Sequence, residues 1–337
     1  MRQPDFRQIL KVLHRERPDR PTLFEFFLNV RLYRRLAGTA WTEGEVDRLT
    51  DMRRLLAAFR AAGYDYATAH GPLGFRAGER DHAQTISLNQ GVLICDRRSF
   101  EAYEWPDANA GDYSAFKDVE GDLGGMRLMI CGPGGVLENV IRLAGYDNLC
   151  FMLADDPALA SDLFEAVGSR LVRHYERAVA YRSVGIVMSN DDWGFKTQTM
   201  LSPEQMRRYV FPWHRRIVEV AHAAGRPAVL HSCGFAGEIM EDVIAGMGYD
   251  GKHSFEDVIC PIEECYRRWG ARIALLGGID LDFILKATPA EIEARSRRML
   301  ALGERGYALG TGNSVPEYIP DEKYFAMTRA ALDERPQ

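Results

Sequence analysis

The sequence predicts an α/β fold of the (β/α)8 TIM-barrel class, in a single domain spanning residues 1–337. The first observation behind this prediction is a set of eight short apolar or β-branched runs, each ending near Gly, Asp, Asn or His. The second is that longer stretches with helical periodicity separate the runs. The third is the lack of a G-x-G-x-x-G fingerprint after the first run, which argues against a doubly wound open sheet. The runs cover residues 21–27, 64–71, 127–133, 184–191, 227–234, 249–255, 273–280 and 307–314.

The segments between the runs carry signals for the beginnings and ends of helices. Several begin with a Ser, Thr or Asp before Pro, as in Ser202-Pro203 and Thr288-Pro289, and several end in Gly just before the next run. We expect the N-terminal helix in 6–16 to close the bottom of the barrel. We expect residues 72–126, a long insertion after the second predicted strand, to form a lid on the side that carries active sites.

Charge and composition exclude several classes of protein. There are 42 Lys plus Arg against 48 Asp plus Glu, a net charge of −6, so the basic excess typical of nucleic-acid binding is missing. The sequence contains no run of about 18 apolar residues, which a membrane span would need, and the charged N-terminus does not resemble a secretory signal. Six scattered cysteines fit a reducing compartment. We therefore expect a cytoplasmic protein without disulfides that binds neither nucleic acid nor membrane, and the sequence leaves open whether it is a monomer or a homodimer.

Polar residues gather at the ends of the predicted strands, where active sites of this barrel class lie. Their convergence predicts a functional site. The candidates for catalysis or substrate contact are Asp191, Asp192, Asn313, His70 and His253, and the candidates for cofactor binding are Glu25, Gly234 and Gly278. Of the neighbouring aspartates, one is expected to point inward as a base, cation ligand or hydrogen-bond anchor, while the other caps a turn.

The sequence His231-Ser-Cys233 predicts a metal site. Residues two apart in an extended segment point the same way, so the imidazole and the thiol can reach one cation, and both are good Zn²⁺ ligands. Glu256, at the end of the next predicted strand, is the expected third ligand. Three protein ligands with an open position describe a catalytic zinc site. Cys260 and Cys265 are expected to be packing residues.

Three segments of the chain resemble the uroporphyrinogen decarboxylase superfamily. They are "LSPEQMRRYVFPWHRRIVEVAHAAGRPAVLHSCG", "GGIDLDFILKATPAEIEARSRRML" and "LGTGNSVPEYIPDEKYFAM". The resemblance implies a TIM barrel and two branches of activity. True uroporphyrinogen decarboxylases work without metal, through an arginine-rich N-terminal tract and an aspartate after strand two. Here the corresponding stretches read "FEFFLNVRLYRRLAG" and "ATAHGP", and Arg31, Arg34 and Arg35 look like helix residues.

The other branch contains zinc-dependent methyltransferases that move a methyl group between a corrinoid and a thiol, and their H-x-C motif matches His231 and Cys233. The resemblance implies a final cysteine ligand where this chain has Gly312-Asn313, so the site has three ligands or Asp191 or Asp192 supplies the last position. The predicted function is zinc-dependent methyl transfer between a corrinoid protein or free methylcobalamin and a thiol or another acceptor such as tetrahydrofolate. A metal-free decarboxylase-like lyase and a non-catalytic tetrapyrrole-binding protein are the alternatives.

Overall fold

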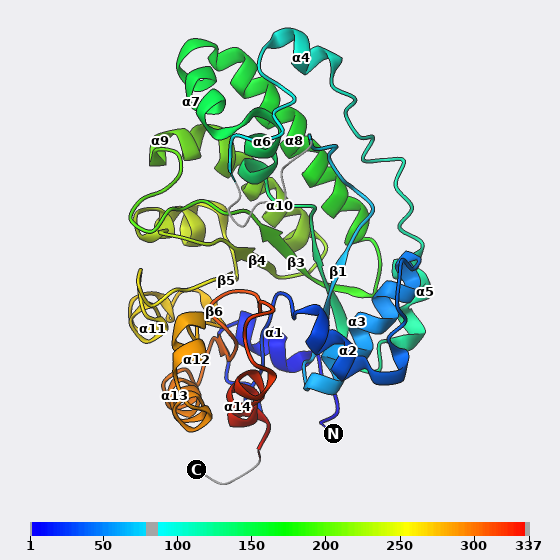
Figure 1. Ribbon diagram of the computed structural model, residues 1–337, viewed down its shortest axis with the longest axis vertical. Coiled ribbons are helices and arrows are strands. Elements are labelled where there is room, and N and C mark those ends of the chain that lie inside the picture. The colour runs from blue at the N-terminus through cyan, green and yellow to red at the C-terminus, as the bar shows by residue number, and fades with distance from the viewer. Residues whose placement is uncertain (1, 79–86, 334–337) are drawn as a thin grey trace.

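Seven parallel strands form a single sheet in the computed structural model, which describes residues 2–78 and 87–333. Each strand pairs with the next one in sequence, in the order β1 to β7, and helices surround the sheet (Figure 1). This is an α/β fold compatible with a TIM-like barrel. The strands are β1 (Tyr66–His70), β2 (Arg127–Cys131), β3 (Val184–Asn190), β4 (Ala228–His231), β5 (Gly251–His253), β6 (Ala274–Leu276) and β7 (Tyr307–Ala308).

Seven of the eight predicted strands are therefore confirmed, and the first is reduced to a single bridge. Leu23 forms a parallel bridge with Leu309 beside β7. On its other side this segment meets side chains of β1 instead of its backbone. The Tyr66 hydroxyl hydrogen-bonds the backbone of Glu25, and the Thr68 hydroxyl donates to the carbonyl of Phe26 at 2.7 Å. These side chains occupy the backbone groups that a ladder with β1 would use.

The register of β3, β4 and β5 brings three strand ends to the same level. Asn190 pairs with His231, and His231 pairs with His253. Because the strands are parallel, the residues that follow them all leave the sheet at its C-terminal edge. Asp192, Cys233 and the chain after His253 consequently start from neighbouring positions.

The helices confirm the sequence signals that predicted where they start. Asp156, Ser202 and Thr288 cap α8, α9 and α13, each with a proline in the first turn. The helices are α1 (Arg7–Leu13), α2 (Val30–Ala37), α3 (Arg48–Ala62), α4 (Arg97–Ala102), α5 (Ala115–Asp118), α6 (Val136–Ala144), α7 (Tyr146–Asp155), α8 (Pro157–Ala178), α9 (Pro203–Gln205), α10 (Phe211–Ala223), α11 (Ile262–Trp269), α12 (Leu281–Lys286), α13 (Pro289–Leu302) and α14 (Asp321–Leu332). Short 3₁₀ and π turns are η1 (Gly38–Ala40), η2 (Glu120–Asp122), η3 (Met206–Val210), η4 (Gly237–Ile239) and η5 (Asp242–Met247).

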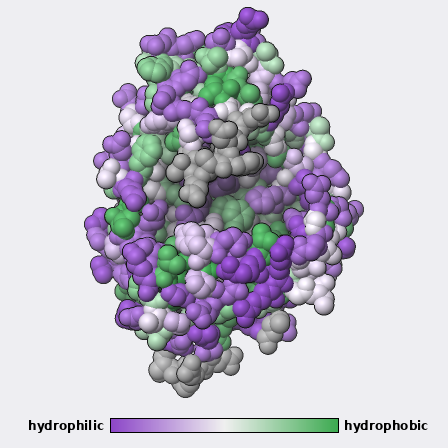
Figure 2. Space-filling model, in the orientation of Figure 1, coloured by the Kyte–Doolittle hydropathy of each residue, from purple (hydrophilic) through white to green (hydrophobic). Residues whose placement is uncertain are grey.

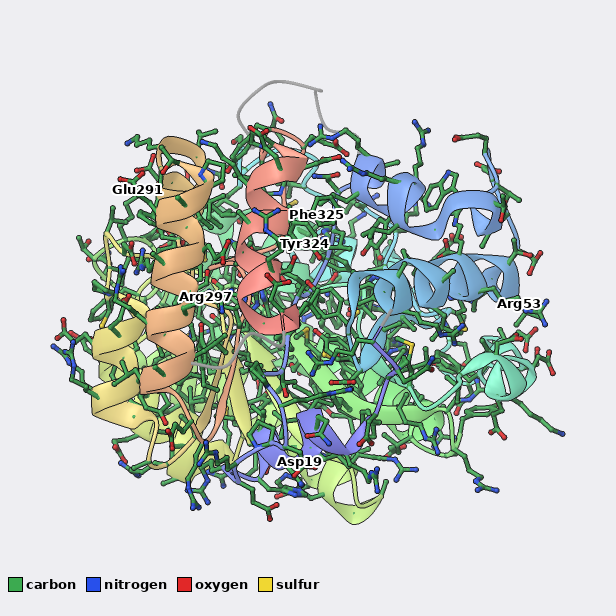
Figure 3. The ribbon with its side chains drawn as sticks, turned by 90° about the horizontal axis from the view of Figure 1, so that it is seen from below. Asp19, Arg53, Glu291, Arg297, Tyr324 and Phe325 are labelled. Atoms are coloured by element: carbon green, nitrogen blue, oxygen red, sulfur yellow. The ribbon has the colours of Figure 1, made fainter. Side chains whose placement is uncertain are left out.

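Helices at both ends of the chain cover the sheet. The Leu13 side chain of α1 lies against Gly251, the first residue of β5, so this helix closes the bottom of the sheet as predicted. Figure 3 shows α13 and α14 side by side, with Glu291 and Arg297 on α13 and Tyr324 and Phe325 on α14. The Tyr324 hydroxyl lies 2.9 Å from that of Tyr64, which fixes α14 to the chain leading into β1.

The segment between β1 and β2 includes residues 72–126, and its being an insertion stays a prediction. Residues 79–86 of it lie outside the described part of the chain. The described part holds α4, α5 and η2, and it is fixed to flanking helices through Arg97 with Asp162 on α8 and Asp122 with Arg53 on α3. Its action as a lid stays a prediction.

One face of the molecule is hollowed at its centre, and hydrophilic side chains predominate around the hollow (Figure 2). Within residues 2–78 and 87–333, no helix combines the length and apolar character needed to cross a membrane.

Candidate metal centre

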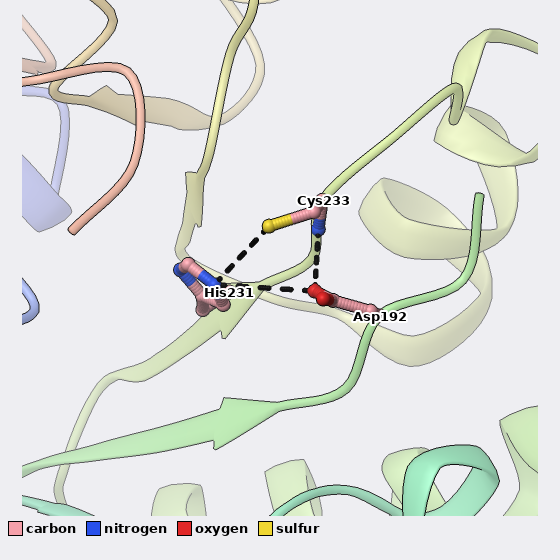
Figure 4. A group of neighbouring side chains, drawn as sticks. All are labelled: Asp192, His231 and Cys233. Carbon is pink, nitrogen blue, oxygen red and sulfur yellow. Dashed lines mark hydrogen bonds and ion pairs between the residues drawn. The ribbon is translucent and has the colours of Figure 1, made fainter. Parts of the chain in front are cut away.

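Three side chains from the ends of β3 and β4 bring metal-binding atoms together. Asp192 follows β3, His231 is the last residue of β4, and Cys233 comes two residues later (Figure 4). One carboxylate oxygen, one imidazole nitrogen and one sulfur all lie within 4.8 Å of one another. We call Asp192, His231 and Cys233 the three-donor group. The side chains of His231 and Cys233 thus lie close together, as the two-residue spacing predicted.

The distances within the three-donor group leave room for a cation. His231 Nε2 lies 3.6 Å from Cys233 Sγ and 4.0 Å from Asp192 Oδ1. The backbone N–H of Cys233 donates to Asp192 Oδ1 at 2.8 Å and holds this carboxylate against the loop. His231 is 6% exposed, whereas 38% of the Asp192 side chain is exposed. The group is therefore open to solvent on the side of the carboxylate and closed on the side of the imidazole.

A hydrogen-bond relay sets the tautomer of His231. His253 Nε2 lies 3.2 Å from the carbonyl oxygen of Thr311, which can only accept, so this nitrogen carries a proton. Burial lowers the pKa of His253 to about 3, which keeps the ring neutral and leaves its Nδ1 as an acceptor. His231 Nδ1, 2.8 Å away, must then donate. The lone pair of His231 Nε2 consequently faces Cys233 and Asp192, as a metal ligand requires.

The sulfur of Cys233 receives two further hydrogen bonds. The amide of Asn313 donates to it at 3.1 Å, and the hydroxyl of Ser254 donates at 3.5 Å. Burial, followed by the nearby charge of Asp192, raises the pKa of the Cys233 thiol to about 12. At neutral pH the free thiol keeps its proton, so a cation is needed to form the thiolate.

The loops that carry the group are held against each other by backbone contacts. Phe235 donates its N–H to the carbonyl of Phe195 at 2.7 Å. Gly234 has φ +80°, and a Cβ there would lie 2.0 Å from the carbonyl oxygen of Gly194. A glycine is needed at this position so that the two loops can approach closely. This packing explains Gly234, and its predicted part in cofactor binding stays a prediction.

The two neighbouring aspartates have different roles. Asp191 is fully buried and accepts from the backbone N–H groups of Leu137 and Glu138 at 2.9 and 2.8 Å, at the start of α6. It also lies 2.9 Å from His214 Nε2. Asp191 therefore anchors a helix, whereas Asp192 turns toward His231 and Cys233. Asp191 is thus the inward hydrogen-bond anchor that the sequence suggested, whereas Asp192 contacts the loop of Cys233 and not the turn that it was expected to cap. The predicted catalytic roles of both residues stay predictions.

Glu256 does not belong to the three-donor group that the described residues form, although it was the expected third ligand. The chain leaves β5 at His253, and the backbone N–H of Phe255 donates to the carbonyl of Gly312 at 2.9 Å. Beyond this contact Glu256 lines a separate cavity together with Lys252. Asp192 is the third member of the group that the described residues form.

Other predicted residues lie apart from the three-donor group. His70 stacks on the ring of Phe27 at the end of β1. Glu25 is buried beneath Thr311, whose N–H and hydroxyl lie 2.8 and 2.7 Å from its two oxygens. At Gly278 a Cβ would lie 2.5 Å from the side chain of Ile262, so packing explains this glycine. Their predicted catalytic and cofactor-binding roles stay predictions.

Sequence reasoning missed two residues beside the group, Ser254 and Lys252. Lys252 was detectable, because a charged residue inside the short strand between Gly251 and His253 must be buried on one face of the sheet. Nothing in the sequence distinguishes Ser254 from an ordinary loop serine.

Comparison with known proteins gives one family and one fold. Residues 116–333 match the family profile described as uroporphyrinogen decarboxylase (URO-D). Curated uroporphyrinogen decarboxylases from Anaeromyxobacter sp. strain Fw109-5 and Anaeromyxobacter dehalogenans strain 2CP-C are each 25% identical to the chain over 187 residues. The match covers 55% of this chain and 51% of each relative, so the chain spans about half the length of the curated relatives it matches.

Two solved structures share the fold over nearly the whole chain. A methyltransferase from Methanosarcina mazei superposes with a TM-score of 0.73 at 17% identity, covering 96% of this chain and 97% of its own. A putative vitamin-B12 independent methionine synthase from Listeria monocytogenes gives a TM-score of 0.50 at 12% identity, covering 95% and 100%. At these identities the likeness establishes a common fold.

Proposed function

Because the chain belongs to the uroporphyrinogen decarboxylase family, we propose that it is a zinc-dependent methyltransferase built on that family's fold. Its substrates are a corrinoid, free or carried by a partner protein, and a thiol or another nucleophilic acceptor such as tetrahydrofolate. The observation that carries the proposal is the three-donor group at the strand ends, with the His231 lone pair directed into it. The fold shared with a solved methyltransferase is compatible with this proposal.

The donor set fits zinc. Thiolate sulfur, imidazole nitrogen and carboxylate oxygen are the ligand atoms that Zn²⁺ takes in proteins, and three of them leave the open position typical of catalytic sites. Asp192 and Cys233 contribute one negative charge each once the thiol is deprotonated. The site is then neutral with Zn²⁺, as it would be with two thiolates and one imidazole, so Asp192 compensates for the cysteine missing at Gly312-Asn313.

The residues around the group have roles that follow from their contacts. A bound Zn²⁺ would lower the pKa of an acceptor thiol or other nucleophile held in the open position. Asn313 and Ser254 donate to Cys233 Sγ, which withdraws charge from this sulfur and keeps it a ligand instead of a competing nucleophile. His253 and Thr311 orient His231. Asp192, whose side chain is partly exposed, gives the site its opening to solvent.

The decarboxylase alternative is favoured by the names of the curated relatives. Against it, the arginines of the N-terminal region are engaged by acidic partners on the described chain. Arg31 and Arg35 pair with Asp321 at 2.8 and 3.1 Å, and Arg34 pairs with Glu43 at 2.8 Å. All three lie on α2, as helix residues, and Arg31 and Arg35 hold this helix to the start of α14. A substrate with many carboxylates would have to displace these partners.

Two measurements on the purified protein test the proposal. Protein purified without added metal should contain close to one zinc per chain, and Cys233→Ala or Asp192→Asn should lose it. Cys150→Ala and His222→Ala, at exposed positions away from the group, serve as matched controls that keep their zinc. The zinc-loaded protein should demethylate methylcobalamin in the presence of a thiol. Full zinc in Cys233→Ala, or decarboxylation of uroporphyrinogen by metal-free protein, would overturn the proposal.

A further inference from the structure

A second site lies behind the three-donor group, outside the wall of strands. A cavity of about 230 Å³ opens between the loop after β4, the chain after β5, and α11. Figure 1 shows α11 beside β5 on this side of the sheet. The volume is somewhat below the roughly 300–1,000 Å³ of most small-molecule sites, so an occupant must be small.

One residue that lines this cavity, Lys252, is buried and has no carboxylate partner among the described residues. Lys252 is 2% exposed, and its ammonium donates to the carbonyls of Ser254 at 2.8 Å and Ser232 at 3.4 Å. No ion pair to Lys252 occurs within the described residues. Arg295, a comparably buried cation at 7% exposure, pairs with both Asp257 and Glu263. Burying an ammonium group without an anionic partner costs free energy. Arg295 has such partners, and Lys252 has none among the described residues.

The charges lining the cavity balance, but only one pair is in contact. Arg268 and Glu264, both on α11, form an ion pair with each other. The two remaining charges, Lys252 and Glu256, line the same cavity without forming an ion pair in the described structure. A small anion would be attracted by Lys252 and repelled by Glu256. A ligand that carries both charges satisfies both residues.

The remaining walls are largely apolar. Met240, Phe255 and Trp269 contribute side chains to the cavity, and the Lys252 ammonium lies 4.5 Å from the centre of the Phe255 ring. We propose that this cavity binds a small amino acid with an apolar side chain, its carboxylate on Lys252 and its ammonium on Glu256. The side chain then lies against Met240 and Trp269. This goes beyond the proposed function and does not depend on the metal.

One residue connects the two sites. The carbonyl of Ser254 accepts from Lys252, while its hydroxyl donates to Cys233 Sγ. An occupant that draws the ammonium of Lys252 toward its own carboxylate weakens the contact to the Ser254 carbonyl. The cavity is thus placed to influence the sulfur of Cys233 through a single residue.

Three probes that share one five-carbon chain and differ in the charged groups attached to it test the proposal by titration calorimetry. Norleucine carries both charges, hexanoate only the carboxylate, and pentylamine only the ammonium. We expect norleucine to bind tightest, hexanoate about tenfold more weakly, and pentylamine not at all, since a tenfold change corresponds to about 1.4 kcal/mol. Failure of norleucine to bind at millimolar concentrations, or equal binding of hexanoate, would overturn the proposal. Zinc-depleted protein should give the same ranking.

Two substitutions locate the probes. Lys252→Met, which keeps the length of the side chain, should weaken norleucine and hexanoate by at least about tenfold. Glu256→Gln, at a partly exposed position, should weaken norleucine and leave hexanoate unchanged or tighter. Arg267→Met removes an exposed charge from α11 outside the cavity and should change neither. Norleucine binding that is unaffected by Glu256→Gln would contradict the proposal even if Lys252→Met failed to fold.

Discussion

Two histidine–cysteine contacts lie at strand ends in the described part of the chain, and one of them belongs to a group that could hold a metal ion. In the three-donor group, His231 is oriented by His253, and Cys233 Sγ receives hydrogen bonds from Asn313 and Ser254. In the second, which we call the β1–β2 pair, His70 Nδ1 lies 3.3 Å from Cys131 Sγ. The residue types are the same, so the difference must lie in what surrounds them.

The β1–β2 pair lacks each of the features that prepare the three-donor group. The nitrogens of His70 lie 3.3 and 3.7 Å from Cys131 Sγ, so the sulfur sits beside the ring instead of in line with one lone pair. The sulfur faces the carbonyl of Ala69, which cannot donate to it. Burial raises the pKa of both Cys131 and Cys233, so the thiols do not differ in this respect, but no carboxylate joins the β1–β2 pair in the described chain. Orientation and charge, more than residue identity, distinguish a ligand set from a packed contact.

The largest expected effect comes from replacing the cysteine of each site by serine, in two separate variants. Cys233→Ser should lower zinc affinity by more than the roughly 10–100-fold cost of losing a residue that only orients a ligand. Cys131→Ser should leave zinc affinity unchanged, because among the described residues Cys131 and His70 have no third metal-binding side chain beside them. Competition with a chromophoric chelator measures both. Equal losses in the two variants would show that the comparison between the sites is wrong.

The next effect concerns the residue that orients His231. His253→Phe removes the acceptor of the His231 Nδ1 proton and frees both tautomers, so zinc affinity should fall by about 10–100-fold. The matched change in the other site, His70→Phe, should have no effect on zinc. Retention of full affinity in His253→Phe, with the fold intact by circular dichroism, would exclude the relay.

The sequence predicted the strands and helix caps better than it predicted the ligands. Seven strands and the caps at Ser202 and Thr288 follow from local patterns that the chain itself carries. The first strand was overestimated because the hydroxyls of Tyr66 and Thr68, distant in sequence, take its backbone groups. Long-range hydrogen bonds of this kind leave no trace in the local pattern.

The candidate site was predicted for the residues fixed by strand alternation and not for those fixed by loops. His231 lies in a strand and Cys233 follows it by two residues, so spacing alone placed them together. Glu256 lies beyond a contact between Phe255 and Gly312 that spacing cannot reveal. The choice between Asp191 and Asp192 was open for the same reason, since β3 ends at Asn190.

A third prediction concerns Glu25, which contacts Thr311 at the end of the hydrogen-bond relay from His231 through His253, and it is tested by varying pH. Glu25 Oε2 lies 2.7 Å from the hydroxyl of Thr311, which also contacts the carbonyl of Asn313. That hydroxyl has one proton, and the carbonyl can only accept it, so Glu25 itself carries the proton of its contact with Thr311. Burial raises the pKa of Glu25 from 4.5 to about 8, in agreement with this arrangement.

The sign of the resulting pH dependence is fixed. A carboxyl group whose pKa is higher in the folded state favours folding at low pH, and this contribution is lost as pH rises. The contribution of Glu25 to the free energy of unfolding should be greatest below pH 4.5. Between pH 4.5 and about 8 it should fall, with a slope approaching 1.36 kcal/mol per pH unit. Glu25→Gln should flatten that slope in urea titrations at several pH values. An unchanged slope would show that Glu25 is ionised in the folded protein.

The smallest expected effect belongs to Asn313, which occupies the region where the family resemblance implies a cysteine ligand. Its amide donates to Cys233 Sγ at 3.1 Å, so Asn313→Ala should cost one hydrogen bond to a charged sulfur, about 1.5–3 kcal/mol at most. Because the sulfur keeps Ser254 as a donor, only part of this cost should be felt, and we expect zinc affinity to fall by less than about tenfold, which is less than about 1.4 kcal/mol. Asn313→Cys should raise it instead, since a second thiolate replaces the amide. With Co²⁺ in place of zinc, the sulfur-to-metal charge-transfer band should strengthen in Asn313→Cys and remain in Asn313→Ala. A band of unchanged strength in Asn313→Cys would mean that this position cannot reach the metal, and that Asp192 alone completes the ligand set.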